Sequence, residues 1–372
     1  MARLDHICKL NMGQSPDSSS YNEERFGLPF FQGNADFGQV HPTARVWCSK
    51  PTKEAKPGDI LISVRAPIGA LNIADVDCCI GRGLAALTVN EKVCSKGYLW
   101  HALRGKVKEL NQKGTGSTFK AISKNTLAET EIRLPSLDEQ MHIAVVLDKV
   151  DDLISLRKQE LTKLDELVKA RFVEMFGNQK YSPTSLIELI EEGAGLSYGI
   201  VVPGDNVEDG VPMIRPSDFK NNNLCLDGVY RVAPEIEVKY ERTRLTGDEI
   251  LVQVIGQPGQ IMLSDDRCKG MNVTRNLAVI RPDCNRINRI YLKTYMQTQE
   301  AQAFMLGEVK QSTLKQLPLG RLKELEIPVP PMERQKKFAA FAEQTDKSKL
   351  AIQKSLDKLE TLKKALMQKY FG

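Results

Sequence analysis

Residues 117–120 read Ser-Thr-Phe-Lys, and residues 312–315 read Ser-Thr-Leu-Lys. The two segments lie 312 − 117 = 195 residues apart. The same offset relates further matches: Glu129-x-Glu131-Ile132 and Glu324-x-Glu326-Ile327, Pro135 and Pro330, Gln140 and Gln335, and Phe176-Gly177 and Phe371-Gly372. A repeat of this length is too long for the unit of a solenoid, so it predicts two homologous halves related by a pseudo-two-fold repeat.

A looser match precedes the strict one in each half. Residues 58–64 read Gly-Asp-Ile-Leu-Ile-Ser-Val, and residues 247–254 read Gly-Asp-Glu-Ile-Leu-Val-Gln-Val. The glycines that follow, Gly69 and Gly259, lie 259 − 69 = 190 residues apart. Each half therefore joins a divergent part to a strongly shared part, which indicates variable functional regions on a common frame.

The composition is that of a globular protein with two or three domains, since 41% of the 372 residues are hydrophobic and 27% are charged. No apolar run has the length of a membrane span, and the N-terminus lacks the apolar core of a signal peptide, so we expect a cytoplasmic protein. Eight scattered cysteines without a Cys-x-x-Cys pair predict reduced thiols. The formal net charge of +5 is compatible with nucleic-acid binding but does not decide it.

The pattern of apolar runs predicts fold class α+β. Short runs broken by Gly, Pro and Asn indicate two mixed α/β globular domains, over residues 1–135 and 178–331. Within them we expect strands at 58–64, 84–89, 249–255 and 276–280, and helices at 98–112 and 290–306. A long helix follows each domain, over residues 136–177 and 332–372.

Both long helices carry apolar residues at coiled-coil spacing. In the first helix these are Ile143, Leu147, Val150, Ile154, Leu161, Leu164 and Val168, and in the second they are Phe338, Ile352, Leu356, Leu359 and Leu366. We expect the two helices to pair as an antiparallel coiled coil that separates the domains. Roughly 33 residues at about 1.5 Å each would make a rod about 50 Å long. The alternative is that each stripe packs on its own globular domain.

The first half contains Gly13-Gln14-Ser15-Pro16, Tyr21-Asn22, Gly-Leu-Pro-Phe-Phe-Gln-Gly at 27–33 and Gly-Asp-Ile-Leu-Ile-Ser-Val-Arg-Ala-Pro-Ile-Gly at 58–69. These segments resemble the target-recognition domain of type I restriction-modification specificity subunits. Residues 116–123, the step Ile132-x-Leu134-Pro135 and Gln140 resemble the approach to the central conserved helix of that family. The second half departs from the pattern, with Gln253, Ile255, Gly256 and Gln257 in place of Ser63, Arg65, Ala66 and Pro67.

The resemblance implies a specificity subunit that has no catalytic activity of its own. Residues 1–135 and 178–331 would be target-recognition domains 1 and 2, and residues 136–177 and 332–372 would be the central and C-terminal conserved helices. The expected partners are double-stranded DNA with a bipartite target, two DNA methyltransferase subunits and restriction/translocase subunits, and not a membrane. S-adenosylmethionine and ATP are expected on partner subunits only. The sequence agrees, because it has no Walker A loop, no Asn/Asp-Pro-Pro-Tyr/Phe motif and no His cluster for a metal.

Phosphate contacts position a protein on DNA, and base-edge contacts read the sequence. The loop shared by the two halves offers small residues, hydroxyls and cations. We therefore predict phosphate contacts from Lys113, Thr115, Ser117, Thr118, Lys120, Lys310, Ser312, Thr313 and Lys315. The alternative is that this loop only caps the turn into the next strand.

Base readers should differ between halves that recognise different sequences. Arginine, glutamine and asparagine have the chemistry to pair with guanine or adenine edges. The candidates are Arg25, Gln32, Arg65 and Arg82 in the first half, and Arg215, Gln253, Gln257, Arg275 and Asn276 in the second. The alternative for each is an ordinary surface or structural role, and for Arg65 it is to anchor the turn beside Pro67 and Gly69.

Two other functions remain open. A duplicated DNA-acting enzyme would need a repeated acid cluster, but the repeated acid, Asp59 and Asp248, follows Gly at a strand start, where a turn-forming role is favoured. A structural tether would instead bind proteins through its two domains. The specificity-subunit interpretation predicts a split methylation motif with a fixed gap of roughly one helical turn or less.

Overall fold

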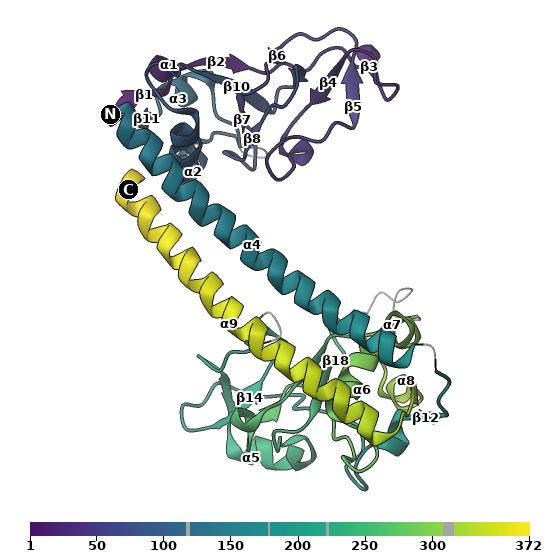
Figure 1. The fold of residues 1–372 in the computed structure, drawn as a ribbon. Coiled ribbons are helices and arrows are strands. Elements are labelled where there is room, and N and C mark those ends of the chain that lie inside the picture. Colours follow the sequence, from purple (N-terminus) through teal and green to yellow (C-terminus); the bar gives the residue numbers. More distant parts are fainter. Residues whose placement is uncertain (117–119, 178, 221–222, 308–315) are drawn as a thin grey trace. The chain divides into compact units, whose positions relative to one another are not determined.

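The computed structural model describes residues 1–116, 120–177, 179–220, 223–307 and 316–372. The chain divides into two compact units (Figure 1). The first unit comprises residues 1–159 and 352–372, and the second comprises residues 160–351. Each unit therefore contains part of both long helices.

The first unit is built around two β-sheets. Its elements are β1 (Ala2–Arg3), α1 (Leu4–Ile7), β2 (Cys8–Met12), η1 (Ser18–Ser20), β3 (Tyr21–Asn22), β4 (Leu28–Phe31), η2 (Asn34–Asp36), β5 (Val46–Cys48), β6 (Glu54–Ala55), β7 (Ile60–Ser63), β8 (Leu71–Ile73), β9 (Cys78–Ile80), β10 (Leu84–Val89), α2 (Lys96–Lys113), α3 (Lys124–Ala128), β11 (Glu131–Ile132) and the start of α4 (Leu137–Phe176). The four-stranded sheet has the order β2-β10-β7-β8, and the five-stranded sheet has the order β3-β5-β4-β9-β6.

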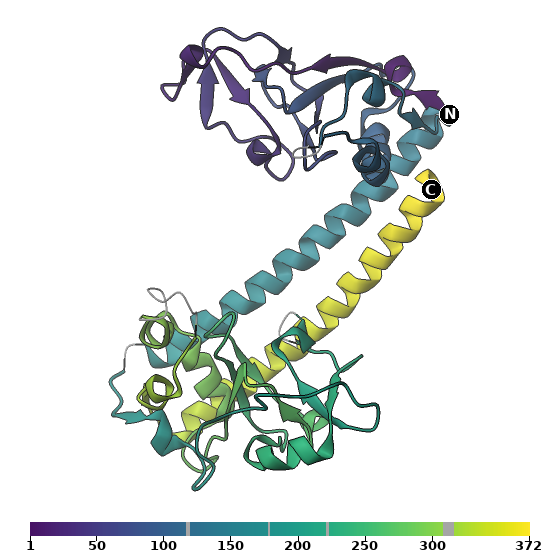
Figure 2. The same ribbon diagram turned by 180° about the vertical axis from the view of Figure 1, so that it is seen from behind.

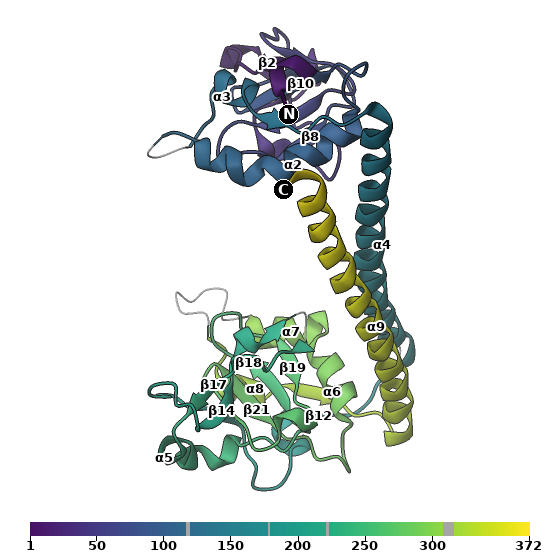
Figure 3. The same cartoon turned by 90° about the vertical axis from the view of Figure 1, so that its left-hand side faces the viewer.

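Strand β7 lies between two hydrophobic cores of the first unit. Its side chains alternate between the two faces of the sheet, as in any β-strand. Ile60 and Ile62 pack with Leu103 of α2, which lies along this sheet (Figure 3). Leu61 packs on the other side with Phe31 of the five-stranded sheet. All four residues of β7 are buried, which is the pattern expected of a strand covered on both faces.

The second unit repeats the four-stranded sheet. Its elements are β12 (Pro183–Ser185), η3 (Leu186–Leu189), β13 (Ser197–Tyr198), β14 (Val211–Ile214), η4 (Pro216–Asp218), β15 (Phe219–Lys220), β16 (Asn223–Leu224), β17 (Tyr230–Val232), α5 (Pro234–Glu237), η5 (Val238–Thr243), β18 (Ile250–Gln253), β19 (Ile261–Leu263), η6 (Asp266–Cys268), β20 (Asn272–Val273), β21 (Leu277–Ile280), α6 (Arg289–Met296), α7 (Gln299–Leu306), α8 (Leu319–Lys323), β22 (Glu326–Pro328) and part of α9 (Met332–Phe371). The order β13-β21-β18-β19 matches β2-β10-β7-β8, and a three-stranded sheet has the order β17-β14-β20.

The two four-stranded sheets pair in the same register. Ser63 lies opposite Leu84 in the first unit, and Gln253 lies opposite Leu277 in the second. The equivalent residues of β7 and β18 therefore differ by 253 − 63 = 190, and those of β10 and β21 differ by 277 − 84 = 193. These offsets identify equivalent positions in the two units.

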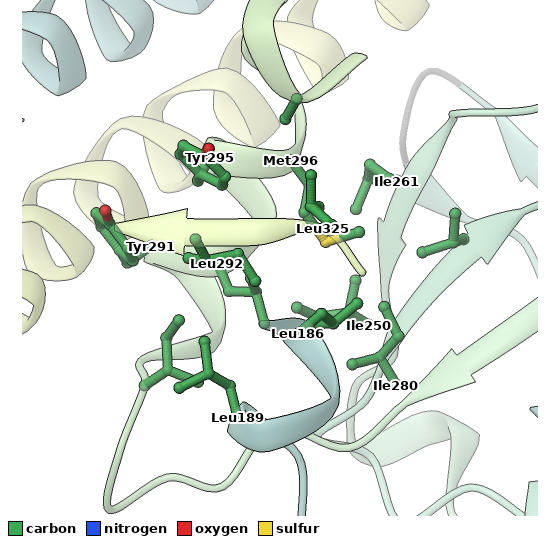
Figure 4. Close-up of a cluster of buried hydrophobic side chains, with 14 of the residues drawn as sticks. Leu186, Leu189, Ile250, Ile261, Ile280, Tyr291, Leu292, Tyr295, Met296 and Leu325 are labelled. Carbon is green, nitrogen blue, oxygen red and sulfur yellow. The ribbon is translucent and has the colours of Figure 1, made fainter. Parts of the chain in front are cut away.

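The main core of the second unit lies between its four-stranded sheet and helix α6. Ile250 and Ile280 of the sheet gather with Leu292 and Met296 of α6 and with Leu186 (Figure 4). All five side chains are fully buried. Burying a side chain of this size contributes about 1.5 to 3 kcal/mol, so this cluster contributes substantially to the stability of the unit.

Helices α4 and α9 each run unbroken for 40 residues (Figure 2). Within the first unit, Asp151 pairs with Lys363 at 2.5 Å and Lys158 pairs with Glu360 at 3.2 Å. Within the second unit, Lys349 pairs with Asp165 at 2.6 Å. In the first unit, the later α4 residue, Lys158, pairs with the earlier α9 residue, Glu360. These helix segments therefore run in opposite directions.

The ends of both apolar stripes also pack on the globular parts. Ile143 and Leu147 of α4 are buried in the core of the first unit, where Phe371 of α9 packs as well. In the second unit, Phe172 of α4 stacks on Tyr291 of α6 with ring centroids 5.4 Å apart. Both long helices therefore pack on a globular part near one end, as the alternative considered from the sequence requires.

The helices and strands expected from the sequence are found in the structure, with one clear error. The helix expected at 98–112 is α2, and the strands expected at 249–255 and 276–280 are β18 and β21. The single helix expected at 290–306 is wrong, because α6 ends at Met296 and α7 starts at Gln299. Thr298 caps the second helix by accepting a hydrogen bond from Ala301 N at 3.3 Å. The eight cysteines, all within the described ranges, are free thiols as expected.

Candidate nucleic-acid interface

The loop after β7 holds Arg65 at the surface. Ser63 is 1% exposed, and its hydroxyl donates to Pro67 O at 2.6 Å and accepts from Ala70 N at 2.9 Å. Gly69 N donates to Ser63 O at 2.9 Å, with Gly69 at φ +89°, a conformation that favours glycine. The loop is thus fixed from within, and the Arg65 side chain is exposed rather than used to anchor it.

The loop shared by the two sequence halves returns to this same place. Lys120 O accepts a hydrogen bond from Ala66 N at 2.9 Å, and Arg65 forms an isolated β-bridge with Ala121. Thr115 and Ala121 exchange two backbone hydrogen bonds of 2.9 Å. The exposed Lys120 therefore lies directly beside the Arg65 loop.

A second turn, between β9 and β10, presents Arg82. Gly81 N donates to Phe31 O at 2.8 Å, and Leu84 N donates to Gly81 O at 3.0 Å. Val64 N donates to Gly83 O at 2.9 Å, which joins this turn to the Arg65 loop. Arg82 is the exposed residue of a turn whose other members are buried.

These loops line an open surface cavity of about 190 Å³ in the first unit. Its lining residues are Gln32, Gly33, Asn34, Arg65, Ala66, Arg82 and Gly83. Three of the candidate base readers, Gln32, Arg65 and Arg82, thus come together from three separate parts of the sequence. Asn34 was not anticipated, because asparagine is common in turns and nothing local marks this one.

Two arginines and no carboxylate are among the described residues that line the cavity. The Asp36 carboxylate accepts a hydrogen bond from Gln32 N at 2.8 Å, but an ion pair with Arg45 neutralises its charge. Within the described ranges, neither Arg65 nor Arg82 has an acidic partner at ion-pair distance. Two guanidinium groups and two amides at one surface suit phosphate oxygens and the acceptor edges of bases.

The second unit repeats the Arg82 turn. Thr274 N donates to Ile214 O at 3.0 Å, and Leu277 N donates to Thr274 O at 3.0 Å. Asn276 O accepts from Val254 N at 2.8 Å, as Gly83 O accepts from Val64 N. Arg275 is exposed in this turn, and Asn276 is half-buried.

The other candidates of the second unit have local partners. Gln253 is 6% exposed and its amide donates to Ile255 O at 2.9 Å, so the structure gives it a role in the turn. Arg215 pairs with Asp218 at 3.0 Å and lies 5.6 Å from the centre of the Tyr230 ring. These two side chains are occupied within the fold.

The remaining second-unit candidate is exposed. Gln257 accepts a hydrogen bond from Gln260 Nε2 at 2.9 Å within the same surface turn. An exposed amide of this kind can exchange a neighbouring side chain for a ligand at little cost.

Some candidates lie away from the cavity or outside the described residues. Arg25 has a φ of 63° and lies 5.5 Å from the centre of the Trp47 ring, and it does not line the cavity. Lys113 pairs with Glu109 at 2.6 Å. The predicted phosphate contacts that lie outside the described residues are Ser117, Thr118, Lys310, Ser312, Thr313 and Lys315.

The register corrects the repeated acid identified in the sequence. Ile60 and Ile250 are equivalent, so Asp59 corresponds to Glu249 and not to Asp248. Asp59 accepts from Lys56 N at 2.9 Å, and Glu249 accepts from Thr246 N at 2.6 Å. Both acids close the turn before a strand, which is a structural role.

Over the described ranges, no group of three or more His, Cys, Asp or Glu side chains is placed to hold a metal ion. In the same ranges, no helix combines the length and apolar character needed to cross a membrane.

Comparisons with known proteins agree with the resemblance stated from the sequence. A family model described as "Type I restriction modification DNA specificity domain" matches residues 1–166 and 203–364. The EcoBI type I restriction enzyme specificity subunit of Escherichia coli is 24% identical over 410 aligned positions, which cover 99% of this chain and 84% of that protein. The MjaX protein of Methanocaldococcus jannaschii, named as a candidate type I restriction enzyme specificity subunit, is 43% identical over 161 residues.

The coverage of these matches differs. The MjaX match spans 43% of this chain and only 38% of that relative. A crystal structure of a type I restriction-modification system S subunit from M. genitalium has the same fold, with a TM-score of 0.64 and 16% identity over 100% of this chain and 95% of that one. Because the family model matches well over half of the residues, this chain belongs to the type I restriction modification DNA specificity domain family, that of the specificity subunits of type I restriction-modification systems.

Proposed function

We propose that this chain is the sequence-specific DNA-binding subunit of a type I restriction-modification complex and that it recognises a bipartite target. The observation that carries this proposal is the cavity in the first unit, where Gln32, Asn34, Arg65 and Arg82 meet and where the described lining residues include no carboxylate. These are the side chains that pair with guanine and adenine edges and with phosphates. The second unit repeats the same frame, so the chain offers two DNA-binding sites.

The proposed recognition domains are residues 1–135 and 178–331. The proposed linking elements are residues 136–177 and 332–372, which we take to pair as an antiparallel coiled coil with pseudo-two-fold symmetry. The ion pairs of Asp151 with Lys363 in one unit and of Asp165 with Lys349 in the other support this arrangement. A linking coiled coil of fixed length would set the gap between the two half-sites.

The proposed phosphate contacts come from the loop beside the first cavity and from its copy. Lys120 is the described member that best supports this role, because it is exposed and its carbonyl is bonded to Ala66 N. The proposed base readers of the first domain are Gln32 and Arg65, together with Asn34 of the same cavity. Gln253 and Arg215 are left out, since their polar groups are occupied within the second unit.

The proposed protein partners are two DNA methyltransferase subunits and restriction/translocase subunits, with S-adenosylmethionine and ATP bound by those partners. The support is family membership, together with relatives named as specificity subunits of restriction enzymes. A hollow of about 490 Å³ in the second unit, between α4 and the start of α9, is lined by Arg171, Glu174, Met175, Glu333, Arg334 and Lys337. Its mixed charges suit a polar protein interface. We further propose that the chain itself has no catalytic activity.

The test is selection of bound duplexes from a random DNA library, with the purified chain alone and with its methyltransferase partner. We expect a split motif of two unlike half-sites separated by a gap of constant length. If neither preparation enriches any motif, the DNA-recognition proposal is wrong and a protein tether becomes the better explanation. Metal-dependent cleavage of DNA by the purified chain would contradict the proposed lack of catalysis.

A further inference from the structure

Arg82 and Arg275 hold the same place in the two units. Both are exposed, and three equivalent backbone hydrogen bonds close the two turns. They differ by 275 − 82 = 193, which is also the offset between the equivalent residues Leu84 and Leu277. The offset is not the 195 of the sequence repeat, so the equivalence appears only in the strand register.

The other positions around the cavity differ in chemistry between the units. Arg65 corresponds to Ile255, since 255 − 65 = 190 is the offset of β7 and β18. Gly33 and Arg215 hold equivalent places, because each precedes a 3₁₀ helix whose third residue is an aspartate bonded to the capping residue. Gln32 is an additional residue of the first unit and has no counterpart.

Arg215, which stands where the first unit has Gly33, does not add an unpaired positive charge to the second unit. Its guanidinium donates to Asp218 at 3.0 and 3.3 Å. In the first unit the equivalent acid, Asp36, is instead neutralised by Arg45. Arg82 and its equivalent Arg275 are therefore the arginines that both units share at these positions. Within the described ranges, neither has an acidic partner.

We infer that Arg82 and Arg275 are matched phosphate contacts that fix each unit on the DNA backbone, whereas Gln32, Asn34 and Arg65 read bases of one half-site. This inference rests on the proposed function. Two domains that read unlike half-sites need unlike base readers, but phosphates are identical at every sequence. If phosphate contacts are shared and base readers are not, an exposed guanidinium common to both units should lie next to amides that only one unit has. A guanidinium suits the phosphate role because it binds phosphate with two parallel hydrogen bonds.

The experiment combines library selection with binding to one selected duplex across a salt series. Arg82→Ala and Arg275→Ala should each weaken all sequences alike, leave the base preferences of both half-sites unchanged and lower the slope of log K against log salt by about 0.9. Arg65→Ala and Asn34→Ala should instead each relax one base position, roughly tenfold or more, in one half-site.

Arg82→Lys separates charge from geometry. A phosphate contact keeps its salt slope and the base preferences with lysine, because the charge is retained, although the bidentate geometry is lost, whereas a bidentate guanine contact loses its base preference. Lys92→Ala is the matched control, because Lys92 is exposed beyond the opposite end of β10 and should leave both readouts unchanged. Equal urea midpoints for all variants establish that each is folded.

The outcomes separate this inference from the proposed function. If the wild-type chain enriches a split motif but Arg82→Ala or Arg82→Lys changes the preference at one base position with an unchanged salt slope, Arg82 reads a base and the inference is overturned. If the wild-type chain enriches no motif, the proposed function fails and the inference fails with it.

Discussion

Gln140 Oε1 accepts a hydrogen bond from the backbone N–H of Ser95 at 2.9 Å. The amide of the same side chain donates to Pro135 O at 2.9 Å, so one fully buried residue joins the start of α4 to the cap of α2. Its copy, Gln335, accepts from Asn288 N at 2.8 Å and donates to Pro330 O at 2.7 Å. The repeated glutamines are therefore structural joints between each long helix and its own domain.

Replacing Gln140 by alanine should destabilise the first unit by about 1 to 3 kcal/mol, because the half-buried Ser95 N and Pro135 O would lose their partners. The measurement is urea denaturation of the full chain. Gln159→Ala is the matched control, since Gln159 is an exposed residue of the same helix and should change stability by about 0.5 kcal/mol or less. Equal losses for the two variants would contradict the role of Gln140.

Glu249 should matter to the second unit in the same way. It is fully buried and accepts hydrogen bonds from Thr246 N, Gly247 N and Ser264 Oγ at 2.6, 3.0 and 2.8 Å, with Arg281 at 3.3 Å. Burial alone would raise the pKa of Glu249, but these hydrogen bonds outweigh it and hold the pKa below its ordinary 4.5. Its stabilisation is thus present above pH 4.5 and is lost as the pH falls through the folded-state value.

Glu249→Gln should lower the free energy of unfolding by about 3 kcal/mol at pH 7, since the fully buried Glu249 site loses its charge and the partly buried Arg281 loses its acidic partner. Asp248→Asn is the neighbouring control. That carboxylate is exposed and pairs with Arg289 at 3.2 Å, so its loss should cost about 1 kcal/mol or less. Chemical denaturation at pH 7 compares the two, and a larger loss for Asp248→Asn would reverse the assignment.

His101 predicts a pH dependence of the first unit. Burial lowers the pKa of His101 from its ordinary 6.5, although its 2.8 Å contact with Asp148 and the nearby Asp151 oppose this and Arg104 adds to it. Because the unfolded chain binds the proton more readily, this stabilisation is complete above pH 6.5 and falls as the pH is lowered from there towards the folded-state value.

The measurement is the urea midpoint at pH 7.5 and at pH 5.5 for the wild type and for His101→Gln. We expect the variant to be less sensitive to this pH change than the wild type. His142→Gln, at an exposed position of α4, should behave as the wild type. An unchanged pH difference in His101→Gln would show that other groups cause it.

Lys120 should contribute to DNA affinity without selecting sequence. Lys120→Ala keeps the backbone carbonyl that bonds Ala66 N, so the loop should stay in place. We expect weaker binding to all duplexes and a salt slope reduced by about 0.9, as for the loss of one phosphate contact. Fluorescence anisotropy across a salt series measures this, and a slope equal to that of the wild type would rule out a phosphate contact.

Much of the fold can be predicted from local sequence patterns. Helix α2 and strands β18 and β21 were recognisable because strand and helix periodicities are set by neighbouring residues. The break between α6 and α7 is not evident from the sequence because no Gly or Pro marks it, and the cap at Thr298 depends on a single hydroxyl. The cavity residues Gln32, Arg65 and Arg82 could be proposed as DNA contacts from residue type, but Asn34 had no local signal.

The sequence by itself determined the duplication, the two long helices and the family, because these follow from residue identity and short-range spacing. Only the tertiary structure decided which positions are equivalent, since the offset between the halves varies from 190 in β18 to 193 in β21. It also decided that Gln253 is buried while Arg82 is exposed, because burial depends on packing between segments distant in the chain. The equivalence of Arg82 and Arg275 follows from the strand register.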